Sequence, residues 1–146
     1  MVKAVPDGYH TLTPYLIVPD GEAMLHFRHD VFSAELHERF NRPDGTLKHA
    51  ELQIGDSRLM MAQGDQHYHP QTQTFYVYLN DVDATYHRAL ATGAKSLAPI
   101  SDQFYGDRSG GFEDPAGNRW YVATHVEDLN PEEIQRRALA HESLQA

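Results

Sequence analysis

Residues 104–125 read FYGDRSGGFEDPAGNRWYVATH, two runs of strand-compatible residues around one tight turn. The turn is Asp114-Pro115-Ala116-Gly117, where proline fixes one backbone angle and glycine accepts a conformation that other residues avoid. The pattern predicts a hairpin whose strands are Ser109–Glu113 and Arg119–Thr124. This hairpin decides the fold, and it raises the question whether it is purely structural or forms half of a chemical site.

The order of elements that leads to this hairpin occurs twice in the 146-residue chain. Aligning the chain with itself pairs Thr13 with Thr74 and Tyr15 with Tyr76. Each half begins with a strand and a helix and continues through three short strands. We therefore predict an α+β fold of two tandem βαβββ modules, followed by a C-terminal helix for which Asn130 is the expected cap.

The expected boundaries follow from turn residues and hydrophobic periodicity. The first half contains strand Leu12–Val18, helix Gly21–Phe32 and strands Glu35–Phe40, Leu47–Ile54 and Arg58–Ala62. The second half contains strand Phe75–Leu79, helix Val82–Ala91, strand Ser96–Ile100 and the two hairpin strands. The modules are expected to span residues 1–62 and 74–128, with a linker over 63–73 and the terminal helix within 129–146.

Composition excludes several classes of function. The net charge of −9 at pH 7 disfavours nucleic acid as a partner, because phosphate backbones would be repelled. The absence of cysteine excludes a thiol nucleophile and thiolate metal ligands. No apolar run approaches the ~18 residues of a membrane span. Met1–Pro6 lacks the apolar segment of a secretory signal, so we expect a cytoplasmic protein with no membrane partner.

Alternation along the strands predicts which side chains face the helices. Ala50, Leu52 and Ile54 alternate with polar residues, so one sheet face is apolar and the other is open. The same parity places Trp120 and Val122 on the helix side. If the two sheets curve toward each other, the open faces line a cup. Its expected lining is Tyr15, His49, Glu51, Tyr76, Tyr78 and Tyr121.

The tandem modules, the Asp-Pro-x-Gly turn before the last strand and the Val82-Asp83-Ala84 helix start resemble the glyoxalase/bleomycin resistance/dioxygenase superfamily, also called vicinal oxygen chelate proteins. The strings VPDGYHTLTPYLIV, HAELQIGDS, DQFYGDRSG and WYVATHVEDLNPEEIQRR are similar to its PhnB-like branch. The resemblance spans nearly the whole chain. It implies an open, cup-like mixed β-barrel, in which the enzymes of the superfamily hold a divalent metal.

The resemblance also identifies the positions of the usual metal ligands. Carried over residue by residue, they fall on Thr13, Met60 or its neighbour Leu59, Thr74 and Tyr121. Threonine hydroxyls and a neutral phenol are weak metal donors, and a thioether prefers soft metals. We therefore predict no metal and no cofactor at these positions, while a divalent metal held by other residues stays open.

Several residues admit a functional and a plain interpretation. His49 and Glu51 share one strand face, so they could form an acid/base pair, join an unorthodox metal site, or only make the cup polar. Arg108 could clamp an anionic ligand group or form a salt bridge to Asp107 or a neighbouring acid. Tyr105 could form a lip of the cup or seal an interface. His125 could cap the cup or only bond a backbone carbonyl.

Two functions are carried forward, with a third as a weaker alternative. The first is a homodimer that binds a small, partly aromatic or polar molecule without a metal, as sequestering drug-resistance members of the superfamily do. The second is an enzyme of lyase, isomerase or dioxygenase type that uses His49 and Glu51. The third is a dimer surface for a protein partner. The expected ligand-binding residues are Thr13, Tyr15, Thr74, Tyr76, Tyr78, Tyr105, Arg108 and Tyr121.

Overall fold

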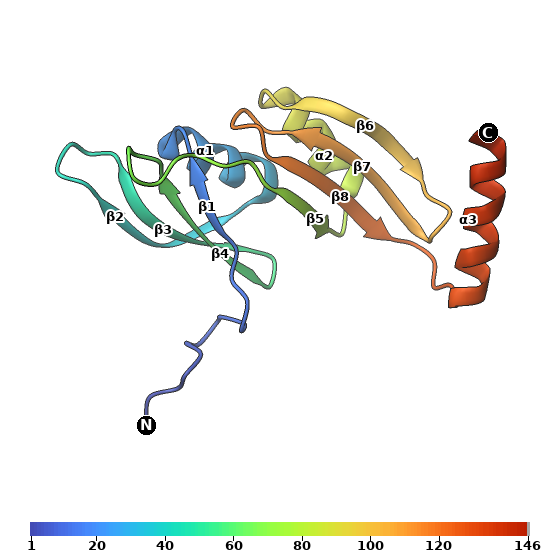
Figure 1. Cartoon of the computed structure of the whole chain (residues 1–146), viewed down its shortest axis with the longest axis horizontal. Helices are drawn as coiled ribbons and strands as arrows, with labels where there is room; N and C mark the ends of the chain where they lie inside the picture. Colours follow the sequence, from blue (N-terminus) through green and yellow to red (C-terminus); the bar gives the residue numbers. More distant parts are fainter. Residues whose placement is uncertain (146) are drawn as a thin grey trace.

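The computed structural model describes residues 1–145 and has the predicted α+β fold, with two four-stranded mixed sheets and three helices. Residue 146, the last of the predicted terminal segment, lies outside the described residues. The two sheets lie side by side and do not close a barrel (Figure 1). No helix of the described chain is long and apolar enough to cross a membrane.

The first module forms one sheet with the strand order β1-β4-β3-β2, in which β1 runs parallel to β4 and the other pairs are antiparallel. Its elements are β1 (Tyr15–Val18), α1 (Gly21–Phe32), β2 (Glu35–Asn41), β3 (Leu47–Ile54) and β4 (Ser57–Gln63). The first strand begins later than predicted, immediately after Pro14, whose nitrogen has no hydrogen to donate to a sheet. We call this sheet A.

The second module repeats the arrangement with the order β5-β8-β7-β6, which we call sheet B. Its elements are β5 (Thr74–Tyr78), α2 (Val82–Ala91), β6 (Lys95–Asp102), β7 (Asp107–Glu113) and β8 (Arg119–His125). The chain ends in α3 (Pro131–Gln145), whose predicted cap is confirmed because Asn130 Oδ1 accepts a hydrogen bond from Glu133 N at 2.8 Å.

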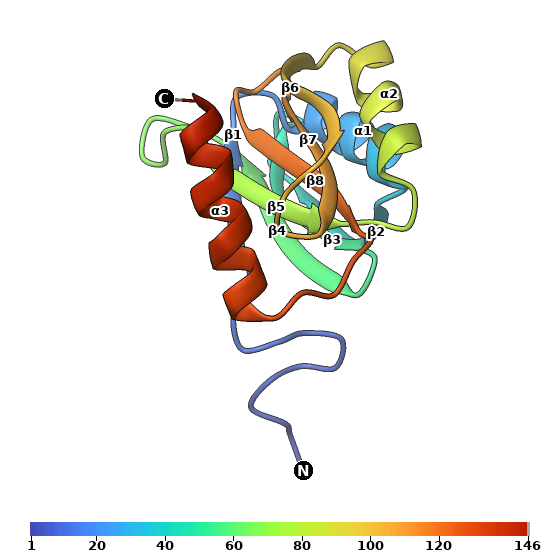
Figure 2. The same cartoon turned by 90° about the vertical axis from the view of Figure 1, so that its right-hand side faces the viewer.

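The helices are arranged unequally about the sheets. Figure 2 shows α1 and α2 together on one side of the sheets and α3 on the opposite side. Helix α3 stands at the outer end of sheet B (Figure 1). Because α1 and α2 cover only one face, the opposite faces of both sheets remain open along most of their length.

Trp120 on β8 joins the two modules. It is 1% exposed, and its ring centroid lies 4.7 Å from that of Phe32 on α1 and 4.5 Å from that of Phe75 on β5. The guanidinium carbon of the fully buried Arg28, also on α1, lies 5.4 Å from the same ring. The predicted core position of Trp120 is therefore confirmed, and its contacts combine both halves into one core.

The carboxylate of Asp114 organises the turn that holds Trp120. The side chain is buried and accepts four hydrogen bonds. Their donors are Ala116 N at 2.9 Å, Asn118 N at 3.0 Å, Asn118 Nδ2 at 3.1 Å and Trp120 Nε1 at 2.9 Å. The first residue of the predicted turn thus sets both the turn and the orientation of the indole.

Replacing Asp114 with Ala is expected to lower the free energy of unfolding by about 3 kcal/mol, because buried donors lose their acceptor. The measurement is chemical denaturation followed by fluorescence of Trp120. Asp56→Ala is the control, since Asp56 lies exposed in another turn, where its side chain accepts a hydrogen bond from Ser57. Equal stability of the two variants would contradict this role for Asp114.

Candidate functional site

The open faces carry the tyrosines that strand parity predicts. On β1, Leu16 and Val18 are buried, whereas Tyr15 is exposed and Ile17 is partly exposed. On β5, Tyr76 and Tyr78 are 46% and 62% exposed. The two faces nevertheless belong to separate sheets. The structure therefore gathers the predicted residues into two clusters, one on each sheet, instead of one cup within the chain.

The cluster on sheet B is centred on Asp107, which is only 3% exposed. Tyr76 Oη and Tyr78 Oη donate hydrogen bonds to its Oδ2 at 2.7 Å and 3.0 Å. His125 Nδ1 donates to its Oδ1 at 2.8 Å. We call these four residues the Asp107 network. One buried carboxylate thereby fixes two phenols and an imidazole beside one another.

Charge within the network is set by hydrogen bonding. Burial alone would raise the pKa of Asp107, but the bonds from His125, Tyr76 and Tyr78 outweigh it and hold the pKa below the ordinary 3.8. Asp107, followed by Asp128, raises the pKa of His125 above 6.5. Burial, with Tyr105 and Asp107 nearby, raises the pKa of Tyr76. The bond between them therefore favours the carboxylate form of Asp107 and the imidazolium form of His125.

Local backbone geometry brings the pair together. Asp107 and His125 are directly opposed in the β7–β8 register. Gly106 has a φ of +100°, and a Cβ there would collide with the backbone oxygen of Glu127. Its own carbonyl accepts a hydrogen bond from Val126 N at 2.9 Å. The loop before β7 is thus closed tightly against the segment after β8, which places Asp107 at the edge of the open face.

The cluster on sheet A contains the predicted His49 and Glu51. His49 Nδ1 lies 3.1 Å from Tyr15 Oη, and His49 Nε2 lies 3.9 Å from Glu51 Oε1. Glu38 faces Glu51 across the strands, and hydrogen bonding to Glu38 and then Tyr9 lowers the pKa of Glu51. Burial and the nearby Glu51 raise the pKa of Tyr9 to about 12. The structure brings the predicted pair together, but at ion-pair distance and without a direct hydrogen bond.

Arg108 is engaged in ion pairs. Its Nε and Nη2 each donate to Asp83 on α2 at 2.9 Å, and Nη1 donates to Asp102 at 3.2 Å. Arg108 therefore forms salt bridges with Asp83 and Asp102, as the salt-bridge alternative expected. Asp107 bonds to Tyr76, Tyr78 and His125 instead. Tyr121 packs over Gly111, where a Cβ would lie 2.8 Å from its ring.

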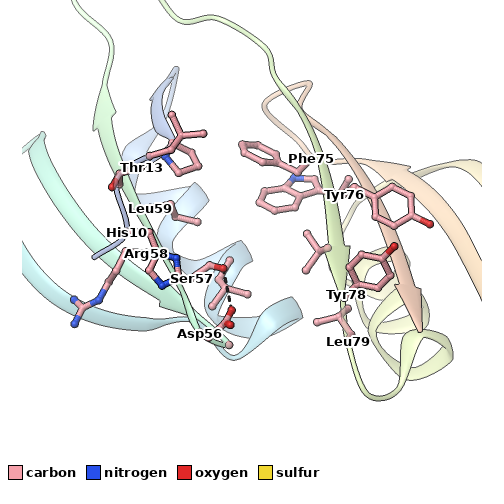
Figure 3. A pocket seen from close by; sticks show the side chains of 16 residues that line it. His10, Thr13, Asp56, Ser57, Arg58, Leu59, Phe75, Tyr76, Tyr78 and Leu79 are labelled. Atoms are coloured by element: carbon pink, nitrogen blue, oxygen red, sulfur yellow. Dashed lines mark hydrogen bonds between the residues drawn. The ribbon is translucent and has the colours of Figure 1, made fainter. Parts of the chain in front are cut away.

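A cavity of about 440 Å³ lies between β4 and β5 (Figure 3). Thr13 lines it from one module and Phe75 and Leu79 from the other. Tyr76 and Tyr78 of β5 also line it, with their hydroxyl ends directed away from β4 (Figure 3). Thr13, Tyr76 and Tyr78 therefore share this cavity, whereas Tyr15 and Thr74 line two other hollows, so the predicted ligand-binding residues do not all meet in one cavity within the chain.

The superfamily's metal positions lack suitable donors. Met60 is paired with Tyr15 in the β1–β4 register, and Tyr121 with Tyr76 in the β5–β8 register. Within residues 1–145, no three side chains of His, Cys, Asp or Glu are grouped so that they could hold a metal ion. The residues at the four positions therefore do not fit the metal that the superfamily's enzymes use.

Comparison with known proteins shows the family to which the chain belongs. The model of the Glyoxalase/Bleomycin resistance protein/Dioxygenase superfamily matches residues 9–122, and the chain belongs to this family. An uncharacterized protein of Mycobacterium bovis is 33% identical over 135 residues, which cover 85% of this chain and 89% of that protein.

Solved structures share the fold at low sequence identity. TioX from Micromonospora sp. ML1 has a TM-score of 0.69 at 24% identity, covering 80% of this chain and 99% of that one. A PhnB protein from Bacillus cereus, described as a putative 3-demethylubiquinone-9 3-methyltransferase, has a TM-score of 0.66 at 19% identity, covering 79% and 99%. The fosfomycin resistance protein FosX from Mesorhizobium loti has a TM-score of 0.59 at 20% identity, covering 79% and 91%.

Sequence reasoning considered Asp107 only as a partner for Arg108 and left the role of His125 open. The missed signal was in the predicted hairpin itself. Counting outward from the turn along both strands pairs Asp107 with His125. Parity also places Asp107 on the same open face as Tyr76 and Tyr78, whose hydroxyl groups it binds.

We predict that the pKa of His125 in the folded protein exceeds 6.5 and falls in Asp107→Asn, which removes the first cause of the shift. Stability from a raised histidine pKa is fully present below the unfolded value and is lost as pH rises through the folded value. NMR titration of the imidazole signals, assigned with His125→Gln, measures this. A His125 pKa at or below 6.5 would show that the pair is absent in solution.

Proposed function

We propose that the protein binds a small organic molecule on its tyrosine-lined open face and does so without the superfamily's usual metal. The observation that carries the proposal is the Asp107 network, which holds Tyr76, Tyr78 and His125 in fixed positions on an otherwise accessible surface. Aromatic rings with fixed polar ends suit a partly aromatic ligand. FosX, which is named a resistance protein for the small molecule fosfomycin, has the same fold.

A second copy of the chain is the proposed cover of the open faces. Exposed aromatic and aliphatic side chains follow both sheets on this side, with Phe40 on sheet A next to His49 and Leu97 on sheet B next to Gly111. Monomeric proteins rarely leave extended apolar patches open. A homodimer that apposes such faces would complete a cup that one chain leaves unfinished.

Light scattering after size-exclusion chromatography is expected to give twice the chain mass of 16.6 kDa at micromolar concentration. Phe40→Lys is expected to shift the protein toward the monomer, because it places a charge in the contact. Leu12→Lys is the control, since Leu12 is exposed in the segment before β1. A monomeric wild type would refute the homodimer.

Thermal stability should distinguish a metal site from an organic ligand site. Mn, Zn, Ni and Fe ions are expected to produce no large stabilisation, and elemental analysis is expected to find no stoichiometric metal. In the same assay, a small aromatic ligand at 100 times its Kd should stabilise the native state by about 2.7 kcal/mol. The effect should shrink in Tyr78→Phe, which loses one hydroxyl.

An enzyme that uses His49 and Glu51 is the alternative function. The short Tyr15–His49 contact favours it, because it orients the imidazole toward Glu51 on the open face of sheet A. Stoichiometric metal that is lost in His49→Gln would support this alternative and contradict the metal-free proposal. The same measurement therefore separates the two functions.

A further inference from the structure

His125 presents one ring nitrogen outside the Asp107 network. Its Nδ1 is committed to Asp107, while its Nε2 lies 2.7 Å from Oδ1 of Asp128 in the segment after β8. A carboxylate only accepts hydrogen bonds, so both ring nitrogens carry a hydrogen and the ring is an imidazolium. The outer N–H is thus a charged donor aimed at an anionic oxygen.

The two carboxylates that bind His125 differ in how readily they can leave. Asp107 is buried and accepts three hydrogen bonds, so its displacement would strand several donors. The side chain of Asp128 is 100% exposed and bonds to His125. Water can solvate Asp128 fully once it leaves. Only the outer partner is exchangeable.

Aromatic surface lies next to this donor. Tyr78 and His125 bind the two oxygens of the same carboxylate, so the phenol and the imidazolium are neighbours. The ring centroids of Tyr76 and Tyr78 are 5.3 Å apart, and both rings are accessible. A planar ring could contact these phenols while an attached group reaches Nε2.

We propose that His125, held by Asp107, is the subsite for the carboxylate of a small aromatic acid, which displaces Asp128 and packs against Tyr76 and Tyr78. The inference rests on the proposed function and narrows it to one ligand class. In the free protein, the side chain of Asp128 occupies the position that the ligand's carboxylate would take. Because one carboxylate replaces another, the charge around the imidazolium is unchanged by binding.

The groups that face His125 define its pH dependence. They are Asp107 from β7, Tyr76 and Tyr78 from β5 through that carboxylate, and Asp128 from the chain after β8. The pKa values of Tyr76 and Tyr78 are raised, by burial and by the bond to Asp107, and the bonds to Asp107 lower its own pKa. Deprotonation of His125 alone removes the outer cation, so affinity for an aromatic acid should fall as pH rises through its raised pKa.

The test compares benzoate with its neutral analogue benzamide on the full chain, with binding followed by NMR. His125→Gln should weaken benzoate at least about tenfold, because a charged hydrogen bond is lost. Asp128→Ala should tighten benzoate about threefold or more, because an internal competitor is removed. Glu132→Ala removes an exposed acid of α3 and should leave the affinity unchanged. Benzamide should respond to none of these changes.

The outcomes separate the subsite from the proposed function. Equal benzoate affinity in wild type, His125→Gln and Asp128→Ala overturns the subsite. The subsite is also overturned if benzoate binds neither wild type nor Asp128→Ala. Benzamide binding that perturbs the Tyr76 and Tyr78 signals would then leave the binding function standing. If neither probe perturbs these signals, both the subsite and the tyrosine-face function fail. Asp128→Ala keeps the test valid if His125→Gln does not fold.

Discussion

The register of the β7–β8 hairpin is the constraint on which the structure depends. Asp114 fixes this register by accepting four hydrogen bonds at the turn, one of them from the indole of Trp120. A slip by one residue would turn Trp120 away from α1 and separate Asp107 from His125. One turn therefore sets the joint between the modules at one end of the hairpin and the candidate site at the other.

The candidate site reverses the polarity of the superfamily's metal centre. A metal cation gathers oxygen and nitrogen lone pairs, whereas the buried carboxylate of Asp107 gathers the hydrogens of two phenols and an imidazole. The side chains bound to Asp107 are therefore held in a defined orientation, and none of them occupies one of the superfamily's four usual metal-ligand positions. The charge that remains accessible is the imidazolium of His125, which is suited to an anion.

Much of the fold follows from local sequence, because turns, caps and periodicity are encoded by neighbouring residues. Both early helices begin and end where predicted, and Asp81 caps α2 by accepting a hydrogen bond from Ala84 N. Strand parity also gave the faces of Trp120 and Tyr76 correctly. The side-by-side placement of the sheets could not be predicted this way, because it depends on packing between α1, α2 and Trp120. The role of Asp107 was missed because it needs contacts from three strands.

The central claim is that the Asp107 network, and no metal, organises the polar groups of the open face. Anomalous diffraction from crystals grown with Mn²⁺ tests it most directly. The account predicts no anomalous peak among strands β1, β5 and β8, with Tyr76, Tyr78 and His125 all bonded to Asp107. A peak bridged by Thr13, Thr74 and Tyr121 would contradict it.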